Sequence, residues 1–142
     1  MKIGDLARAA QCTVETVRYY EREGLLPPPA RTAGNYRDYG QEHAERLRFI
    51  RNCRALDMSH GEIRSVLALA DQPSACCGAV NDVFDQHIAH VAERIRELEH
   101  LRRSLLTLRE RCRRERTVED CGILQGLAEM ESGPPGRHTH LG

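Results

Sequence analysis

The hydrophobic pattern at the start of the chain predicts two short helices joined by a tight turn. Ile3, Leu6 and Ala10 recur at the spacing of one helical face. After a polar interruption, Thr13 is a suitable N-cap for a second helix, whose apolar face begins at Val14. Two short helices with so brief a connection are typical of a helix–turn–helix motif.

The next segment, residues 27–40, is rich in turn-forming residues. Three successive prolines exclude a helix interior, and Gly34 predicts a turn between two short strands. A small hairpin, or wing, is therefore expected here. Helical spacing returns over residues 41–56, and the capping-box pattern of Ser59 and Glu62 opens another helix.

A heptad pattern without proline or glycine runs from residue 79 to about residue 113. Its seam positions are Phe84, Val91, Leu98, Leu105 and Cys112. Acids and arginines fill the other positions, as in a coiled-coil helix, here about 52 Å long. One such helix cannot bury its own seam, so the pattern predicts a homodimer.

Composition excludes several classes of protein. The 142 residues include 21 Lys and Arg against 21 Asp and Glu, which excludes a uniformly basic nucleic-acid coat, although residues 1–54 are mildly basic. No segment is apolar enough to span a membrane, and the first residues do not resemble a signal peptide. A cytoplasmic protein with six free thiols is expected. No acid–base or nucleophile–histidine grouping indicates an enzyme.

Candidate DNA contacts lie on the second helix and on the wing. Arginine and tyrosine side chains reach base edges and phosphates when a helix enters the major groove. The alternatives are a core position for Tyr20 and a solvated face for the arginines. The candidate contacts are Thr13, Thr16, Arg18, Tyr19, Tyr20, Arg31, Asn35, Tyr36 and Arg37.

Five segments of this half resemble the MerR family of bacterial regulators. They are IGDLA at 3–7, VETVRYYE at 14–21, GLLP at 24–27, GNYRDY at 34–39 and FIRNCRALDM at 49–58. The resemblance spans about residues 1–127. It implies a winged helix–turn–helix dimer on a palindrome of double-stranded promoter DNA, which untwists the DNA for RNA polymerase when the ligand binds. The contacts that it implies are Arg18, Tyr19, Asn35, Tyr36 and Arg37.

Three cysteines around the long helix form the main candidate metal site. Cys77 precedes the helix, Cys112 ends it and Cys121 follows nine residues later. The first two lie about 50 Å apart along one helix, but an antiparallel helix pair would bring Cys77 of one chain to the other two of its partner. Plain packing is the alternative for Cys112. The trio also resembles the cysteines of the family's mercury, lead and cadmium sensors.

Thiolate ligands predict a soft divalent ion as the effector. Three sulfurs suit Pb(II) or Hg(II), whereas Zn(II) takes four ligands. By resemblance, a cysteine at position 77 separates the chain from copper and silver sensors, and the segments after Cys77 and Cys121 are similar to the lead and cadmium branch. Pb(II) is therefore ranked first, Cd(II) second and Hg(II) third.

A second metal site is a weaker prediction. Its candidate ligands are Glu62, Asn81, His87 and His90. The two histidines lie three residues apart on one helix face, and some cadmium sensors of the family resemble this arrangement, whereas a solvated face is the alternative. Cys76 is not expected to supply a fourth sulfur, and Cys12 and Cys53 fit core positions.

The sequence therefore predicts a mainly α-helical, metal-responsive transcription activator. Its parts are a winged helix–turn–helix domain (1–75), a loop with an antiparallel coiled-coil dimerisation helix (76–113), a metal-binding loop with a short helix (114–130) and a disordered tail (131–142), in which His138 and His140 are incidental. The alternatives are a mercury-responsive regulator, a drug or redox sensor of the same family, and a metal-storage or trafficking protein without a DNA role.

Overall fold

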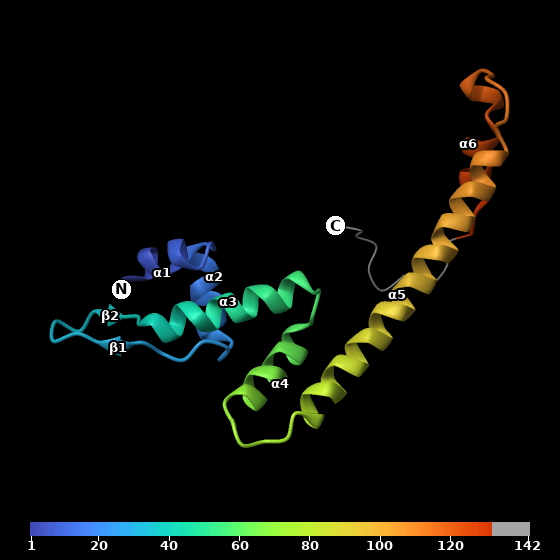
Figure 1. The fold of residues 1–142 in the computed structure, drawn as a ribbon. Helices are drawn as coiled ribbons and strands as arrows, with labels where there is room; N and C mark the ends of the chain where they lie inside the picture. Colours follow the sequence, from blue (N-terminus) through green and yellow to red (C-terminus); the bar gives the residue numbers. More distant parts are fainter. Residues whose placement is uncertain (132–142) are drawn as a thin grey trace. The chain divides into compact units, whose positions relative to one another are not determined.

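The structure, a computed structural model, describes residues 1–131 (Figure 1). Its elements are helices α1 (Ile3–Ala9) and α2 (Val14–Arg22), strands β1 (Ala30–Arg31) and β2 (Arg37–Asp38), helices α3 (Gln41–Ala55), α4 (His60–Ala70) and α5 (Gly78–Glu110), a 3₁₀ turn (Val118–Asp120) and helix α6 (Gly122–Glu129). The mainly α-helical fold with a winged helix–turn–helix and a long helix is confirmed.

The chain divides into a compact unit over Met1–Ile88 and a second unit from Ala89 onward. The predicted tail, with His138 and His140, lies outside the described residues apart from its first position. Within residues 1–131, no helix is long and apolar enough to cross a membrane.

Helices α1 and α2 form the predicted helix–turn–helix. Thr13 caps α2, because its Oγ1 accepts the backbone N–H of Thr16 at 3.1 Å. Gln11 adopts a φ of 55° in the connection between the helices. Leu6 and Val17, one from each helix, are fully buried in the first hydrophobic core.

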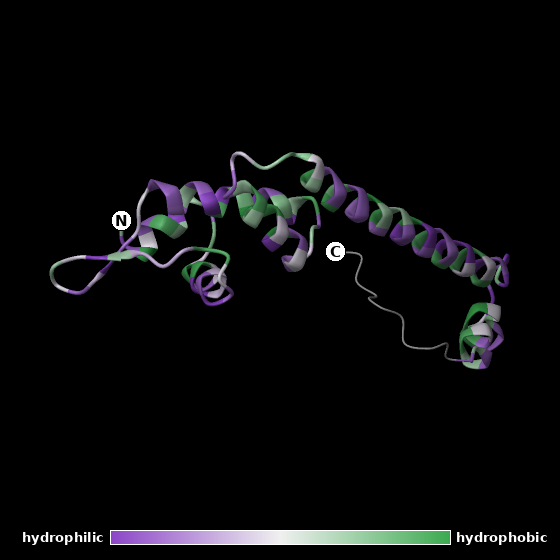
Figure 2. Cartoon of the chain, turned by 90° about the horizontal axis from the view of Figure 1, so that it is seen from below, coloured by the Kyte–Doolittle hydropathy of each residue, from purple (hydrophilic) through white to green (hydrophobic). Residues whose placement is uncertain are grey.

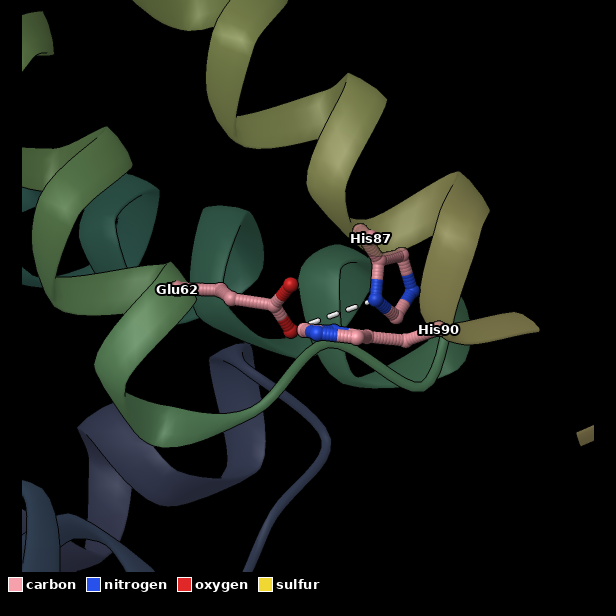
Figure 3. A group of neighbouring side chains, drawn as sticks. All are labelled: Glu62, His87 and His90. Carbon is pink, nitrogen blue, oxygen red and sulfur yellow. Dashed lines mark ion pairs between the residues drawn. The ribbon is translucent and has the colours of Figure 1, made fainter. Parts of the chain in front are cut away.

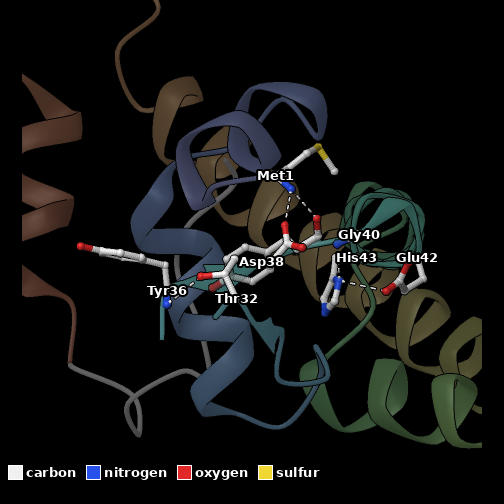
Figure 4. A network of polar contacts seen from close by, with 8 residues as sticks. Met1, Thr32, Tyr36, Asp38, Gly40, Glu42 and His43 are labelled. Atoms are coloured by element: carbon white, nitrogen blue, oxygen red, sulfur yellow. Dashed lines mark hydrogen bonds and ion pairs between the residues drawn. The ribbon is translucent and has the colours of Figure 1, made fainter. Parts of the chain in front are cut away.

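Strands β1 and β2 pair antiparallel and form the predicted wing. Its turn contains Gly34, and Asn35 adopts a φ of 65°, which asparagine tolerates better than most residues. The ammonium group of Met1 donates to Asp38 Oδ1 at 2.8 Å and to the carbonyl oxygen of Tyr39 at 2.7 Å (Figure 4). These bonds hold the end of the wing against Met1, two residues before α1.

Helices α3 and α4 carry a second hydrophobic core. Ile50 is fully buried there and Cys53 is 8% exposed, as predicted for a core cysteine. Cys12 is half-buried against the first core, and burial raises the pKa of both thiols. Val83, from the beginning of α5, packs against the second core, so the first unit includes the beginning of α5.

Helix α5 is continuous over 33 residues, and hydrophobic residues alternate with hydrophilic ones along it (Figure 2). The exposed hydrophobic residues include Phe84, Ile88, Val91, Ile95, Leu101 and Leu105. The helix ends at Glu110 rather than at 113, because the N–H groups of Arg111 and Cys112 donate to carbonyls three residues back and tighten the chain. Cys112 therefore lies two residues beyond the end of the helix.

Helix α6 packs against the end of α5 through two glycines. A Cβ added to Gly122 would collide with the carbonyl oxygen of Arg111, and a Cβ on Gly126 would lie 2.7 Å from Leu108 Cδ2. The segment around Cys121, which precedes α6, therefore depends on glycine for its position.

Replacing Gly122 by alanine is expected to displace α6 and lower the free energy of unfolding by about 1–3 kcal/mol, the range for overpacking. Urea denaturation followed by circular dichroism measures this loss. The matched control is Gly61→Ala, because a Cβ there would meet only Ser59 Oγ, at 3.8 Å. An equal loss in both variants would contradict the proposed close approach.

Candidate DNA interface and metal centres

The predicted DNA contacts lie on α2 and the wing of the first unit. Arg18 and Arg22 of α2 line one open hollow together with Arg37 of β2. Arg37 also lines a neighbouring hollow with Arg31 and Tyr36 of the wing. Guanidinium groups around such hollows suit the oxygens of a phosphate backbone.

Arg37 also joins the wing to α2. Its guanidinium pairs with one carboxylate oxygen of Glu21, and the hydroxyl of Tyr39 donates to the other at 3.0 Å. Within the wing, Arg31 donates to the carbonyl oxygen of Asn35 at 3.1 Å. Both arginines therefore fix the shape of the wing as well as adding positive charge. Nothing in the sequence spacing marks Glu21 as the partner of a strand.

The remaining residues predicted on α2 differ in their surroundings. Tyr20 contacts both hydrophobic cores, and burial raises its pKa, which agrees with the core alternative. The hydroxyls of Thr13 and Thr16 lie 2.8 Å apart at the start of the helix. Tyr19 is half-buried, and its hydroxyl lies 3.1 Å from His60 Nδ1, a contact that the sequence analysis missed.

Two of the three predicted thiol ligands lie together in the second unit. The side chain of Cys112 lies beside that of Cys121, which is the N-cap of α6, and the Cys112 thiol donates to the carbonyl oxygen of Arg114 at 3.4 Å. The nearby backbone N–H groups of Leu124 and then Ile123, in the first turn of α6, outweigh desolvation and lower the pKa of the Cys121 thiol. This arrangement favours the thiolate, which is the form that binds a metal.

Cys77 precedes α5 in the sequence, whereas Cys112 and Cys121 follow it. It is exposed in the turn before the helix, where its carbonyl oxygen accepts the N–H of Asn81 at 3.0 Å. The neighbouring Cys76 is also exposed, and its sulfur accepts the N–H of Gly78 at 3.5 Å. Since all 33 residues of α5 separate Cys77 from Cys112, a single chain brings two of the three predicted thiols together.

Glu62, His87 and His90 form a group in which one ligand atom from each lies within 4.8 Å of the others (Figure 3). Glu62 comes from α4, and the two histidines lie about one turn apart on α5. Asn81, the fourth predicted ligand, is exposed in the first turn of α5. The structure therefore brings together the three ionisable members of the predicted second site.

The orientation of His87 favours a positive charge between it and Glu62. His87 is 9% exposed, and its Nε2 lies 2.7 Å from the carbonyl oxygen of Leu56. A carbonyl oxygen only accepts hydrogen bonds, so Nε2 carries a proton. In the neutral ring, Nδ1 then turns a lone pair toward Glu62 Oε1, 3.2 Å away. Two acceptors at this distance attract each other only with a proton or a cation between them.

Comparison with known proteins identifies the family. Models described as MerR HTH family regulatory protein and as MerR, DNA binding match residues 1–69 and 44–108. The HTH-type transcriptional regulator ZntR homolog of Haemophilus influenzae is 56% identical over 111 residues, which are 78% of this chain and 82% of that protein. The chain belongs to the MerR family.

Two further relatives of this MerR-family chain are informative. The mercuric resistance operon regulatory protein of Bacillus cereus is 36% identical over 126 residues, 89% of this chain and 96% of that protein. A crystal structure is known for the transcription regulator PbrR691 from Ralstonia metallidurans CH34 in complex with lead(II). The sequence of that protein is 52% identical to this one, and the two structures superpose with a TM-score of 0.81 over 89% of this chain and 98% of that one. These relatives are transcriptional regulators rather than enzymes.

Proposed function

We propose that this MerR-family protein binds a promoter palindrome as a homodimer and activates transcription by distorting the DNA when a soft divalent metal binds. The observation that carries the proposal is the pair of Cys112 and Cys121, two neighbouring thiols at the start of α6, of which the second has a lowered pKa. Soft ions bind such sulfurs well. The names of the Bacillus cereus regulator and of the PbrR691 complex, which include mercury and lead, support a metal signal.

The third sulfur of the site comes from Cys77 of the partner subunit. The exposed apolar side chains along α5 support a helix pair, because one helix leaves them in water. In an antiparallel pair, Cys77 of each subunit meets Cys112 and Cys121 of the other. Two equivalent sites then straddle the dimer, so metal binding acts on the relative position of the subunits, as a switch requires.

Pb(II) is the proposed effector, followed by Cd(II) and then Hg(II). Three thiolates complete the coordination that Pb(II) accepts, whereas Zn(II) takes a fourth ligand. The 52% identity to the lead-bound PbrR691 supports placing Pb(II) first. Cd(II) stays close behind, because it is also soft and divalent.

The operator contacts come from α2 and from the wing of each subunit. Arg18 and Tyr19 of α2 reach the major groove, and Tyr36, which is 74% exposed, contacts the backbone from the wing. Asn35 and Arg37 complete the contacts on the wing. DNA distortion by the metal-bound dimer then allows RNA polymerase to use the promoter.

The second proposed site holds a cation between Glu62 and the two histidines. Nδ1 of His87 and Oε1 of Glu62 face each other as two acceptors, and His90 lies beside them. Asn81 is the fourth candidate ligand. Nitrogen and oxygen donors are harder ligands than thiolates, so this site differs from the main one in metal preference.

An anaerobic titration of the reduced protein with Pb(II), Cd(II), Hg(II) and Zn(II), in competition with each other, tests both sites. Sulfur-to-metal absorption is expected to show one tight ion per monomer, strongest for Pb(II) and lost in Cys77→Ser. A second equivalent that His87→Ala removes would support the second site. Equal or tighter Cd(II) binding would change the effector to cadmium, and no tight binding of any soft ion would contradict a metal signal.

A further inference from the structure

His60 joins the helix that faces DNA to the helix behind it. It is the first residue of α4, and its Nδ1 lies 3.1 Å from the hydroxyl oxygen of Tyr19 on α2. The imidazole ring also contacts the ring of Tyr19, with centroids 5.5 Å apart, and that of Tyr20, with centroids 6.2 Å apart. The side chain is half-buried between these groups.

The backbone on either side of His60 is fixed by the capping box of α4. Ser59 Oγ accepts the N–H of Glu62 at 3.1 Å, and Glu62 Oε1 accepts the N–H of Ser59 at 2.8 Å. His60 lies between these two residues, so the turn that carries it is held at both ends. Its imidazole is therefore presented to Tyr19 by a rigid element.

The direction of the hydrogen bond decides what the Tyr19 hydroxyl can do. A phenol has one proton to donate, and a phosphate oxygen only accepts. If Tyr19 donated to His60, it would have no proton left for DNA. If His60 Nδ1–H donates instead, the hydroxyl proton stays available, and the two bonds strengthen each other in a chain.

We propose that His60 is a positioning residue for operator binding: its Nδ1–H donates to the Tyr19 oxygen and directs the Tyr19 hydroxyl proton to a DNA phosphate. This inference rests on the proposed contact between α2 and DNA. It adds a residue of α4 to the determinants of operator affinity, although His60 itself does not touch the DNA.

A double-mutant cycle with a rescue variant tests the proposal. The probe is an operator duplex selected from a random library by the wild-type protein, and its Kd is measured by fluorescence anisotropy. His60→Leu removes the donor in both subunits and is expected to weaken binding about fivefold to thirtyfold. His60→Asn places an amide N–H near the position of Nδ1 and is expected to stay within about twofold of wild type.

The Tyr19→Phe background separates positioning from a merely structural role. There, His60→Leu is expected to cause no further loss, because the hydroxyl that it positions is absent. An undiminished loss in that background, or an Asn variant as weak as the Leu variant, would overturn the proposal.

Arg18→Ala tests the proposed contact between α2 and DNA independently of His60. If it binds the duplex normally, the placement of α2 in the groove fails. If it binds weakly while the cycle shows no coupling between His60 and Tyr19, the inference about His60 fails alone.

Discussion

Replacing Cys112 by serine is expected to abolish metal-induced transcription and to leave operator binding intact. The change removes one of three proposed thiolates, the one that lies beside Cys121. A hydroxyl is a hard, neutral donor, so the affinity for Pb(II) is expected to fall by more than the roughly 10–100-fold that loss of an outer-shell partner costs. The proposed operator contacts lie in the other unit of the chain, so the substitution is not expected to affect them.

Three measurements check this result: a reporter driven by the operator promoter, a gel shift without metal, and a Pb(II) titration. The matched control is Cys76→Ser, which removes an exposed thiol beside Cys77 and is expected to leave induction unchanged. If Cys112→Ser kept metal-induced transcription, Cys112 would have only a packing role. A parallel loss in the Cys76 variant would instead mean that a fourth sulfur takes part.

Local sequence signals predicted most of the fold. Helical spacing placed α1 to α5, and the capping box of Ser59 and Glu62 marked the start of α4 to the residue, because both act within one or two turns. The heptad pattern extends to about residue 113, whereas α5 ends at Glu110. Its last turn tightens where Gly122 and Gly126 bring α6 against it, and such packing leaves no periodic trace in the sequence.

The sequence predicts which residues form the candidate sites, but it does not predict how their side chains are oriented. Spacing grouped His87 with His90, whereas the carbonyl of Leu56, 31 residues away from His87, decides which ring nitrogen faces Glu62. The N–H groups that stabilise the Cys121 thiolate likewise depend on the position of α6. Contacts between residues far apart in the sequence set the orientation of the His87 ring and the state of the Cys121 thiol. A single sequence does not specify such contacts.

The same limit applies at the DNA face. Arginine and tyrosine on α2 and on the wing indicate DNA binding from the sequence, but the partners of these side chains lie on other elements. Arg37 pairs with Glu21, and Tyr19 contacts His60, 41 residues away. Arg18, by contrast, is exposed on α2 and lines the hollow beside the wing, which makes it the sharpest probe of the interface.

Arg18→Ala is accordingly expected to weaken operator binding by at least about 30-fold, while metal affinity stays within about twofold of wild type. One lost contact of an arginine costs about 1–3 kcal/mol, and the proposed dimer presents Arg18 twice. Anisotropy with the selected duplex measures the first quantity, and the competitive Pb(II) titration measures the second. Arg48→Ala, which removes an exposed arginine of α3 from the same unit, is the matched control and is expected to change neither substantially.

The salt dependence of binding then separates two kinds of contact by Arg18. If the guanidinium binds phosphate, the slope of log K against log salt becomes shallower by about one for each arginine removed, and all sequences lose affinity alike. If it binds a guanine edge, the slope changes little and discrimination at one base pair of each half-site is lost. Normal operator affinity in Arg18→Ala would exclude both, and α2 would then not be the helix that enters the groove.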